Sequence, residues 1–239
     1  MITDTIKIAK FLSQTGIASR RLAETLVKQG LISVNGKRMD NVAQRINPQT
    51  DRVGYNGKIL KLPQTAYYLL YKPIGYVSTV KDPHAQKLIT DLVPKIPKVW
   101  PVGRLDKFSS GLILLTNDGE LTQKITHPRY QIEKEYEIAT NFALSPNDLA
   151  IIKNGIHLED GFVKPDLFEQ INPGHYRIII HSGKKRVVRR LIEKIGKKVA
   201  ELKRTRIAFL NLKNLSAGIY RNLSLKEISQ IKSLPSMKK

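Results

Sequence analysis

Four short β-rich runs, separated by turns and helical stretches, constrain the fold of the chain more than any other feature. They read YYLLY (67–71), GLILLT (111–116), YEIAT (136–140) and YRIIIH (176–181). Segments near 120–127, 146–154 and 186–196 have helical character. This mixture of strands and helices favours an α+β domain.

The first 60 residues follow a different pattern. A short helix is expected from about Ile6 to Ser13, and Ser19 is suited to cap a second helix that ends at Gly30. Asn35-Gly36 and Asn56-Gly57 each lie between extended runs, and this dipeptide is the preferred chemistry of a type I′ hairpin. We therefore expect a small module of two helices and several strands.

A linker is expected between the two patterns. The segment KLPQTA (61–66) contains a proline and continues neither a helical nor a strand periodicity. The predicted domains are residues 1–61 and residues 67–232.

The charge of the chain points to a polyanionic partner. The 239 residues include 41 Lys and Arg against 20 Asp and Glu, a net charge of +21. Nucleic acid fits better than a membrane, because no run approaches the roughly 18 to 20 apolar residues of a membrane span. The opening segment MITDTIKIAK also lacks the apolar core of a signal peptide, so we expect a cytoplasmic protein.

The absence of cysteine limits the available chemistry. It excludes disulfides, thiolate zinc sites and cysteine nucleophiles, and the five histidines do not follow HExxH-type spacing. Catalysis would have to use carboxylates, hydroxyls or amines, and no metal site is expected.

Asp106 is the first candidate for such chemistry, in the segment VGRLDKFSSGL (102–112). An aspartate before Ser-Ser-Gly is often a turn or cap residue. Here Gly103 and Gly111 bracket it and an apolar strand follows, so it is mounted on a loop beside a rigid element. A nucleophilic carboxylate in this position would need a cation nearby to stay ionised.

Two further side chains have both a structural and a functional interpretation. Arg104 fits either a contact with RNA or a surface ion pair. The segment QIEKEYEIA alternates with period two and predicts a strand in which Tyr136 and the glutamates face opposite sides. Tyr136 is then either a half-buried sheet aromatic or a platform for an unstacked base.

The segment from Gly183 to Arg206 carries eleven basic residues against two acidic ones. Its Gly-Lys pair lacks the other residues of a phosphate-binding P-loop, so nucleotide hydrolysis is rejected. A helix from Arg186 would have one apolar stripe with Arg189 and Arg190 on its two flanks, and periodicity does not choose between them. The cations are expected to meet phosphates.

Asp118 and Glu120, in TNDGE, offer a weaker alternative. They could pair with Asp106 as the two carboxylates of a hydrolase. Asn-Asp-Gly more simply makes the turn from a strand to a helix.

Five motifs, in order, resemble the rRNA pseudouridine synthases of the RsuA/RluB type. They are YKPIGYVST, VGRLDKFSSGLILLTNDGE, KEYEI, GKKRVVRRLIEKIG and LKRTRIAFLNL. The first 60 residues resemble the S4-like RNA-binding module that precedes the catalytic domain in this family. The resemblance implies a catalytic domain built on a mixed, mainly antiparallel sheet with flanking helices.

The resemblance also implies roles for individual residues. Asp106 matches the nucleophile, Arg104 the arginine implicated in base flipping, and Tyr136 the tyrosine that stacks on the target base. Arg189 matches the arginine that pairs with the aspartate, and Leu202 an apolar position of the uracil pocket. The remaining RNA contacts are expected from basic residues, namely Lys7, Arg20, Arg21, Lys37, Arg38, Lys184, Lys185, Arg186 and Arg190.

The chain departs from the family pattern at two places. Ser182-Gly183 stands where Glu-Gly is usual, and Arg186-Val187-Val188-Arg189 stands where Arg-Gln-Val-Arg is usual. Neither change replaces a residue that is expected to act in the chemistry.

The function implied is isomerisation of uridine to pseudouridine in ribosomal RNA, without a cofactor and by a monomer. The well-formed N-terminal module and KVWPVGRLD favour large-subunit (23S) over small-subunit (16S) rRNA. Two alternatives remain open: a non-catalytic rRNA-binding or ribosome-assembly protein, and a metal-independent RNA hydrolase that uses Asp106 with Glu120.

Overall fold

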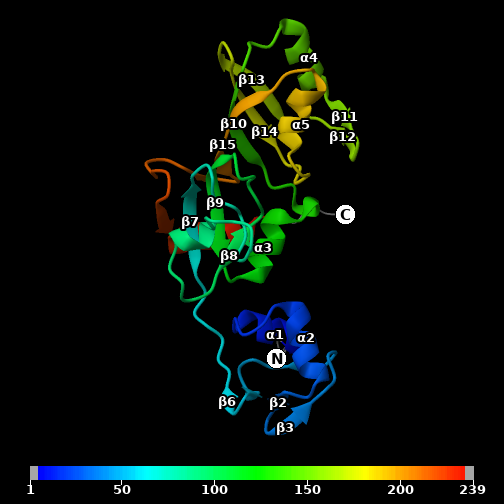
Figure 1. Ribbon diagram of the computed structural model, residues 1–239, viewed down its shortest axis with the longest axis vertical. Helices are drawn as coiled ribbons and strands as arrows, with labels where there is room; N and C mark the ends of the chain where they lie inside the picture. The colour runs from blue at the N-terminus through cyan, green and yellow to red at the C-terminus, as the bar shows by residue number, and fades with distance from the viewer. Residues whose placement is uncertain (1–4, 235–239) are drawn as a thin grey trace. The chain divides into compact units, whose positions relative to one another are not determined.

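In the computed structural model, which describes residues 5–234, the chain divides into two units, one ending at Thr65 and the other starting at Ala66 (Figure 1). The first unit contains two helices, α1 (Ile8–Gln14) and α2 (Arg20–Lys28). Its strands are β1 (Ile6–Lys7), β2 (Ile32–Val34), β3 (Lys37–Met39), β4 (Arg45–Ile46), β5 (Val53–Tyr55) and β6 (Lys58–Ile59).

The helix cap and the two hairpins predicted for the first unit are present in the structure. Ser19 caps α2 by accepting a hydrogen bond from the backbone N–H of Leu22. Asn35-Gly36 and Asn56-Gly57 have positive φ at both residues and close the β2–β3 and β5–β6 hairpins. Helix α1 begins at Ile8 rather than Ile6, because Ile6 and Lys7 pair with β4 instead.

The second unit has one large sheet and several helices. Its strands are β7 (Tyr67–Lys72), β8 (Trp100–Val102), β9 (Ser110–Thr116), β10 (Lys134–Thr140), β11 (Ile156–Leu158), β12 (Gly161–Val163), β13 (Leu167–Asn172), β14 (His175–Ile180), β15 (Val199–Ile207), β16 (Leu210–Asn211) and β17 (Tyr220–Asn222). Its helices are α3 (Gly119–Thr126), α4 (Pro146–Asn154), α5 (Val187–Lys194) and α6 (Leu225–Ser233), with short 3₁₀ turns at Ile89–Leu92 and Pro128–Tyr130.

The sheet is mixed and mainly antiparallel, as expected. Its order is β13-β14-β10-β15-β9-β7-β17, with β16 on β15 and β8 on β9. Only β15 and β9 run parallel among these described pairs. Helix α5 lies beside β11, and α3 lies beside β8 (Figure 1).

The strands β7 and β9 are buried on both faces, which explains their continuous apolar sequences. Leu69, Leu112 and Leu114 belong to one core cluster. Leu70 and Ile113 belong to another, on the opposite face. A third cluster joins β10 and β14 to α4 and α5. Because β7 and β9 each have a neighbouring strand on both sides, the loops at their ends start from rigid supports.

Asp118 makes the turn from β9 to α3. Its carboxylate accepts hydrogen bonds from the backbone N–H groups of Glu120 and Leu121 and from the hydroxyl of Tyr67. It also forms an ion pair with Lys232. These contacts agree with the turn interpretation of TNDGE.

Among residues 5–234, no helix combines the length and the apolar character that crossing a membrane requires.

The parallel pairing of β9 and β15 depends on Gly111. Its φ is +109°, and a Cβ at this position would lie 2.2 Å from the carbonyl oxygen of Arg204. The two backbones therefore approach more closely than any side chain permits.

We predict that Gly111→Ala lowers the free energy of unfolding of this unit by about 2 to 5 kcal/mol, since it adds backbone strain to a steric clash. Gly196→Ala is the matched control: φ is +74° there, but a Cβ would meet nothing within 4 Å. It should cost about 1 kcal/mol. Fluorescence of Trp100, the single tryptophan, reports denaturant unfolding of this unit. Equal losses in both variants would contradict the close approach.

Candidate active site

Asp106 lies in the connection from β8 to β9, on one wall of a cavity of about 360 Å³. Gly103, with φ of +76°, turns the chain out of β8. The backbone N–H of Ser109 donates to the carbonyl of Asp106 at 3.0 Å and closes a tight turn. The Asp106 side chain is 34% exposed, so it is accessible from the cavity.

Lys72 holds this turn from the inside. It is the last residue of β7 and is fully buried. Its ammonium donates to the carbonyl oxygens of Pro73 (3.1 Å), Lys107 (3.4 Å) and Ser109 (2.6 Å). The pKa of Lys72 is lowered to about 8, chiefly by burial and also by the charge of Arg204. The charge of Asp106 acts in the opposite direction and raises it.

Arg189 holds Phe108, the residue between Lys107 and Ser109. Arg189 is 8% exposed, and its guanidinium donates through Nη2 to the carbonyl of Phe108 at 2.9 Å and through Nη1 to that of Val199 at 2.9 Å. Thus the carbonyls of three consecutive residues after Asp106 accept hydrogen bonds from two buried cations. Such charge-assisted bonds are stronger than neutral ones and fix the course of the backbone.

The segment that follows Lys72 braces the turn further. The backbone N–H of Gly75 donates to the carbonyl of Lys107 at 2.8 Å. The buried hydroxyl of Ser78 donates to the carbonyl of Leu105 and accepts from its N–H. The motif YKPIGYVST therefore forms the support of the loop that carries Asp106.

The arginine in contact with Asp106 is not the expected one. Arg186 lies 3.9 Å from the carboxylate, whereas Arg189 donates to the carbonyls of Phe108 and Val199 and to the hydroxyl of Ser109. The reason is the start of α5, which begins at Val187 and leaves Arg186 as its cap residue with φ of +52°. Burial and the charge of Arg186 lower the pKa of Arg189, whereas the charge of Asp106 raises it.

Tyr136 and Leu202 line the same cavity from β10 and β15. The two strands pair with Tyr136 opposite Arg204 and Ile138 opposite Leu202, and the register shifts between Glu135 and Tyr136. A bulge of this kind changes the direction in which neighbouring side chains point.

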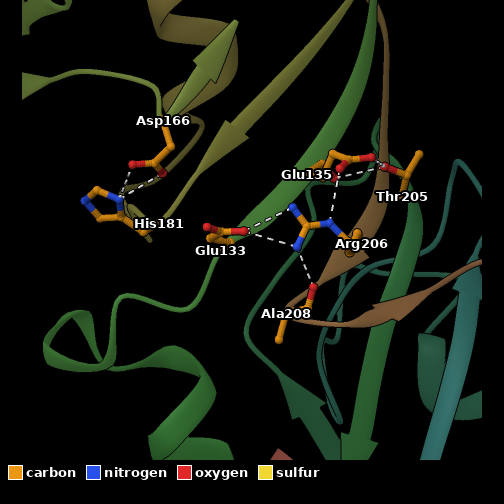
Figure 2. Close-up of polar contacts among 7 residues, drawn as sticks. All are labelled: Glu133, Glu135, Asp166, His181, Thr205, Arg206 and Ala208. Carbon is orange, nitrogen blue, oxygen red and sulfur yellow. Dashed lines mark hydrogen bonds and ion pairs between the residues drawn. The ribbon is translucent and has the colours of Figure 1, made fainter. Parts of the chain in front are cut away.

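Figure 2 shows what holds the strands at this shift. The carboxylate of Glu135 accepts from Thr205 and Arg206 of β15, and Arg206 also binds Glu133. The glutamates thus lie on the face opposite Tyr136, as the period-two pattern predicts. A separate pair, His181–Asp166 at 3.0 Å, holds the end of β14 where the cavity loop 182–186 begins (Figure 2).

Two cations of the cavity were not singled out from the sequence. Burial, together with the charge of Arg204, lowers the pKa of Lys134 to about 8. Arg204 is 4% exposed, donates from Nε to the carbonyl of Leu112, and has its Nη2 buried without a protein partner among the described residues. The sequence around Lys134 and Arg204 does not indicate that they meet in one cavity, because the register between β10 and β15 brings them together.

The expected RNA contacts fall into three groups. Arg104, Lys184, Lys185 and Arg186 line the cavity, and Arg104 is exposed without an ion pair among residues 5–234. Lys184 also contacts Asp160, and Arg190, which is outside the cavity lining, binds the same carboxylate with both terminal nitrogens. The five expected contacts in the first unit are all exposed, namely Lys7, Arg20, Arg21, Lys37 and Arg38.

The cavity is suited to a neutral, planar guest attached to a polyanion. Asp106 is the one acidic side chain among its described lining residues, which otherwise include six cations, one aromatic ring and an apolar patch. Glu120 is absent from this lining. Among residues 5–234, no three His, Asp or Glu side chains are grouped as metal ligands.

Comparisons with known proteins agree with this geometry. A family profile described as RNA pseudouridylate synthase matches residues 66–194, and an S4 domain profile matches residues 6–53. The chain is 38% identical to the ribosomal large subunit pseudouridine synthase B of Bacillus subtilis, covering 95% of this chain and 96% of the relative. It is 40% identical to an uncharacterized RNA pseudouridine synthase of Aquifex aeolicus, covering 95% and 93%.

A solved structure agrees as well. The crystal structure of a pseudouridylate synthase matches with a TM-score of 0.68 and 26% identity, over 96% of this chain and all of that one.

We predict that Lys72→Met lowers the free energy of unfolding at pH 7 by about 1 to 3 kcal/mol, because the carbonyls of Lys107 and Ser109 lose their buried donor. It should also change the pH dependence. Between about pH 8 and 10.5, wild-type Lys72 is protonated in the unfolded chain but not in the folded one, so wild-type stability gains with pH there. The variant should lack this gain.

The matched control is Lys107→Met, the same change at an exposed neighbour. It should shift the stability by less than about 0.5 kcal/mol and keep the wild-type pH dependence. Denaturant titrations followed by Trp100 fluorescence from pH 7 to 10.5 measure both effects. Identical pH profiles for wild type and Lys72→Met would show that Lys72 does not titrate as described.

Proposed function

Because the chain belongs to the RNA pseudouridylate synthase family, we propose that it converts a uridine of large-subunit ribosomal RNA into pseudouridine, with Asp106 as the nucleophile. One observation carries the proposal: Asp106 is the single acidic side chain among the described residues of a cavity lined with cations, an aromatic ring and aliphatic groups. A reaction that needs one carboxylate and a bound uracil fits this lining.

Ribosomal RNA as the substrate is supported by the relatives and by the first unit. The relative from B. subtilis is named for the large ribosomal subunit, and its similarity extends over 95% of this chain. The S4 domain match lies within a unit whose eleven basic residues exceed its four acidic ones and include exposed Arg20 and Arg21. This excess suits the phosphates of a folded RNA.

The target uridine must leave its stack before it can react, at a cost of a few kcal/mol. Arg104 is exposed on the cavity wall two residues before Asp106 and is suited to occupy the place that the base vacates. Tyr136 offers a ring for stacking, and Leu202 beside it offers an apolar contact. We assign these side chains to extrusion and holding of the base.

The chemistry breaks the bond between ribose C1′ and uracil N1 and forms one between C1′ and C5. The proton leaves C5 and N1 gains one, so atoms and electrons balance without a redox partner or an energy source. The Asp106 carboxylate either attacks C1′ directly or removes a ribose proton to give a glycal. Lys134 and Arg204 would offset the negative charge that builds on the detached uracil.

Arg186, the cap residue of α5, and Arg189, within α5, have different roles beside Asp106. Arg186 lies 3.9 Å from the carboxylate and forms an ion pair with it. Arg189 acts as a positioning residue, since it donates a hydrogen bond to the carbonyl of Phe108 in the Asp106 turn. The charge of Asp106 raises the pKa of Arg189 without an ion pair between the two.

We predict that Asp106→Asn reduces pseudouridine formation on a large-subunit rRNA transcript by at least about 10⁴-fold, because the amide is not a nucleophile. RNA affinity should stay within about twofold, since the side chain keeps its size. Carbodiimide-dependent primer-extension stops measure the product. Wild-type product levels from the purified variant would contradict the assignment.

Glu120→Gln is the control for the hydrolase alternative. It should retain wild-type pseudouridine formation, and the RNA should stay intact with both proteins. Metal-independent chain scission that is lost in Glu120→Gln would favour the hydrolase, while RNA binding without any product from wild type would favour a non-catalytic ribosome-assembly role.

We predict that the double change Arg20→Gln with Arg21→Gln weakens rRNA binding and reduces the slope of log K against log salt by roughly 1 to 2, as expected for two lost phosphate contacts. Product formation at saturating enzyme should be nearly unchanged. The control is Lys153→Gln with Lys164→Gln, which removes two exposed cations of the second unit that are not expected to touch RNA. Equal slopes for both double variants would refute the assignment to α2.

A further inference from the structure

Phe108 is an aromatic side chain that the proposed chemistry does not use. It lies in the turn that closes from Asp106 to Ser109, and both of these residues line the cavity. Its ring is 67% exposed, in spite of the cost of leaving a large apolar group in water.

The backbone beneath Phe108 is held in place. Its own carbonyl accepts from Arg189, and the carbonyls of Lys107 and Ser109 accept from Lys72. Because these three carbonyls are bound to interior cations, the side chains of Lys107 and Phe108 are left outside. A ring on a fixed backbone loses little further entropy when it binds a partner.

The surroundings of Phe108 are cationic. The ammonium of Lys107 lies 5.9 Å from the centre of its ring. Arg104 is exposed two residues before Asp106, and the Arg186 side chain is 41% exposed beside the carboxylate. An exposed ring among cations is the combination that unpaired nucleic acid requires, since the ring stacks on a base while the cations meet phosphates.

Exposed phenylalanines elsewhere in the second unit provide the comparison. Phe142 is 75% exposed and Phe162 51% exposed. Among residues 5–234, no cation lies over either ring. Single exposed apolar residues are common on proteins and need no functional reason, so exposure alone does not distinguish Phe108. Its fixed backbone, its cation and its place beside Asp106 do.

We propose that Phe108 stacks on the base of a nucleotide that flanks the target uridine. This inference rests on the proposed function, because extrusion of the uridine leaves its neighbour without a stacking partner. The ring of Phe108 then replaces the lost stacking outside the cavity, while Tyr136 receives the extruded base inside it. The ligand is thus an unpaired nucleobase of the substrate RNA, of any sequence.

The test uses the full chain with Asp106→Asn as background, so that binding is measured without turnover. Adding Phe108→Ala should weaken binding of a large-subunit rRNA transcript about 5- to 100-fold, the range found for loss of one base–aromatic stack. Adding Phe108→Trp should restore or exceed the original affinity. The slope of log K against log salt should stay constant, because no phosphate contact is lost.

Phe142→Ala in the same background is the matched control and should change affinity less than about twofold. In the chain with intact Asp106, Phe108→Ala should lower kcat/KM for pseudouridine formation by about the same factor as binding. A circular-dichroism melt like that of wild type would show that the turn still folds.

The outcomes separate this inference from the proposed function. If wild type forms pseudouridine while Phe108→Ala binds and reacts as wild type does, the stacking role is wrong and the function stands. If wild type forms no pseudouridine, the function is wrong, and the binding series still decides whether Phe108 contacts RNA. A loss that Trp does not restore would also overturn the stacking role and point to an altered turn.

Discussion

Two buried cations anchor the structure around Asp106. Lys72 and Arg189 come from opposite parts of the second unit, yet both donate to the carbonyls that follow the aspartate. Among residues 5–234, neither cation forms an ion pair with a carboxylate, and their charges are met by carbonyl dipoles and by the attraction of the Asp106 charge. The interior thereby fixes the loop while the carboxylate itself remains accessible.

The central sheet makes this arrangement possible. Strand β9 pairs in parallel with β15 through Gly111, and β7 lies on its other side with Lys72 at its end. The Asp106 turn therefore lies between the strand that carries Lys72 and the strand that carries Leu202 and Arg204. The register shift at Glu135, held by Thr205 and Arg206, brings β10 and Tyr136 to the same cavity.

Much of this could be predicted from the sequence. The apolar runs of β7 and β9 and the alternation of β10 follow from burial and periodicity, and the Asn-Gly hairpins from turn chemistry. The grouping of Asp106, Arg104, Tyr136 and Leu202 follows from the resemblance. The contacts of Lys72, Lys134 and Arg204 depend on strand register, which no local pattern encodes. Arg186 rather than Arg189 forms the ion pair with Asp106, and this depends on α5 beginning at Val187, one residue later than expected.

The most direct measurement is a map of pseudouridine across the ribosomal RNA of cells that lack this protein, complemented with either wild type or the Asp106→Asn variant. The account predicts that a pseudouridine in large-subunit RNA disappears without the protein and returns only with the wild-type chain. An unchanged map in the absence of the protein, or full restoration by the variant, would contradict it.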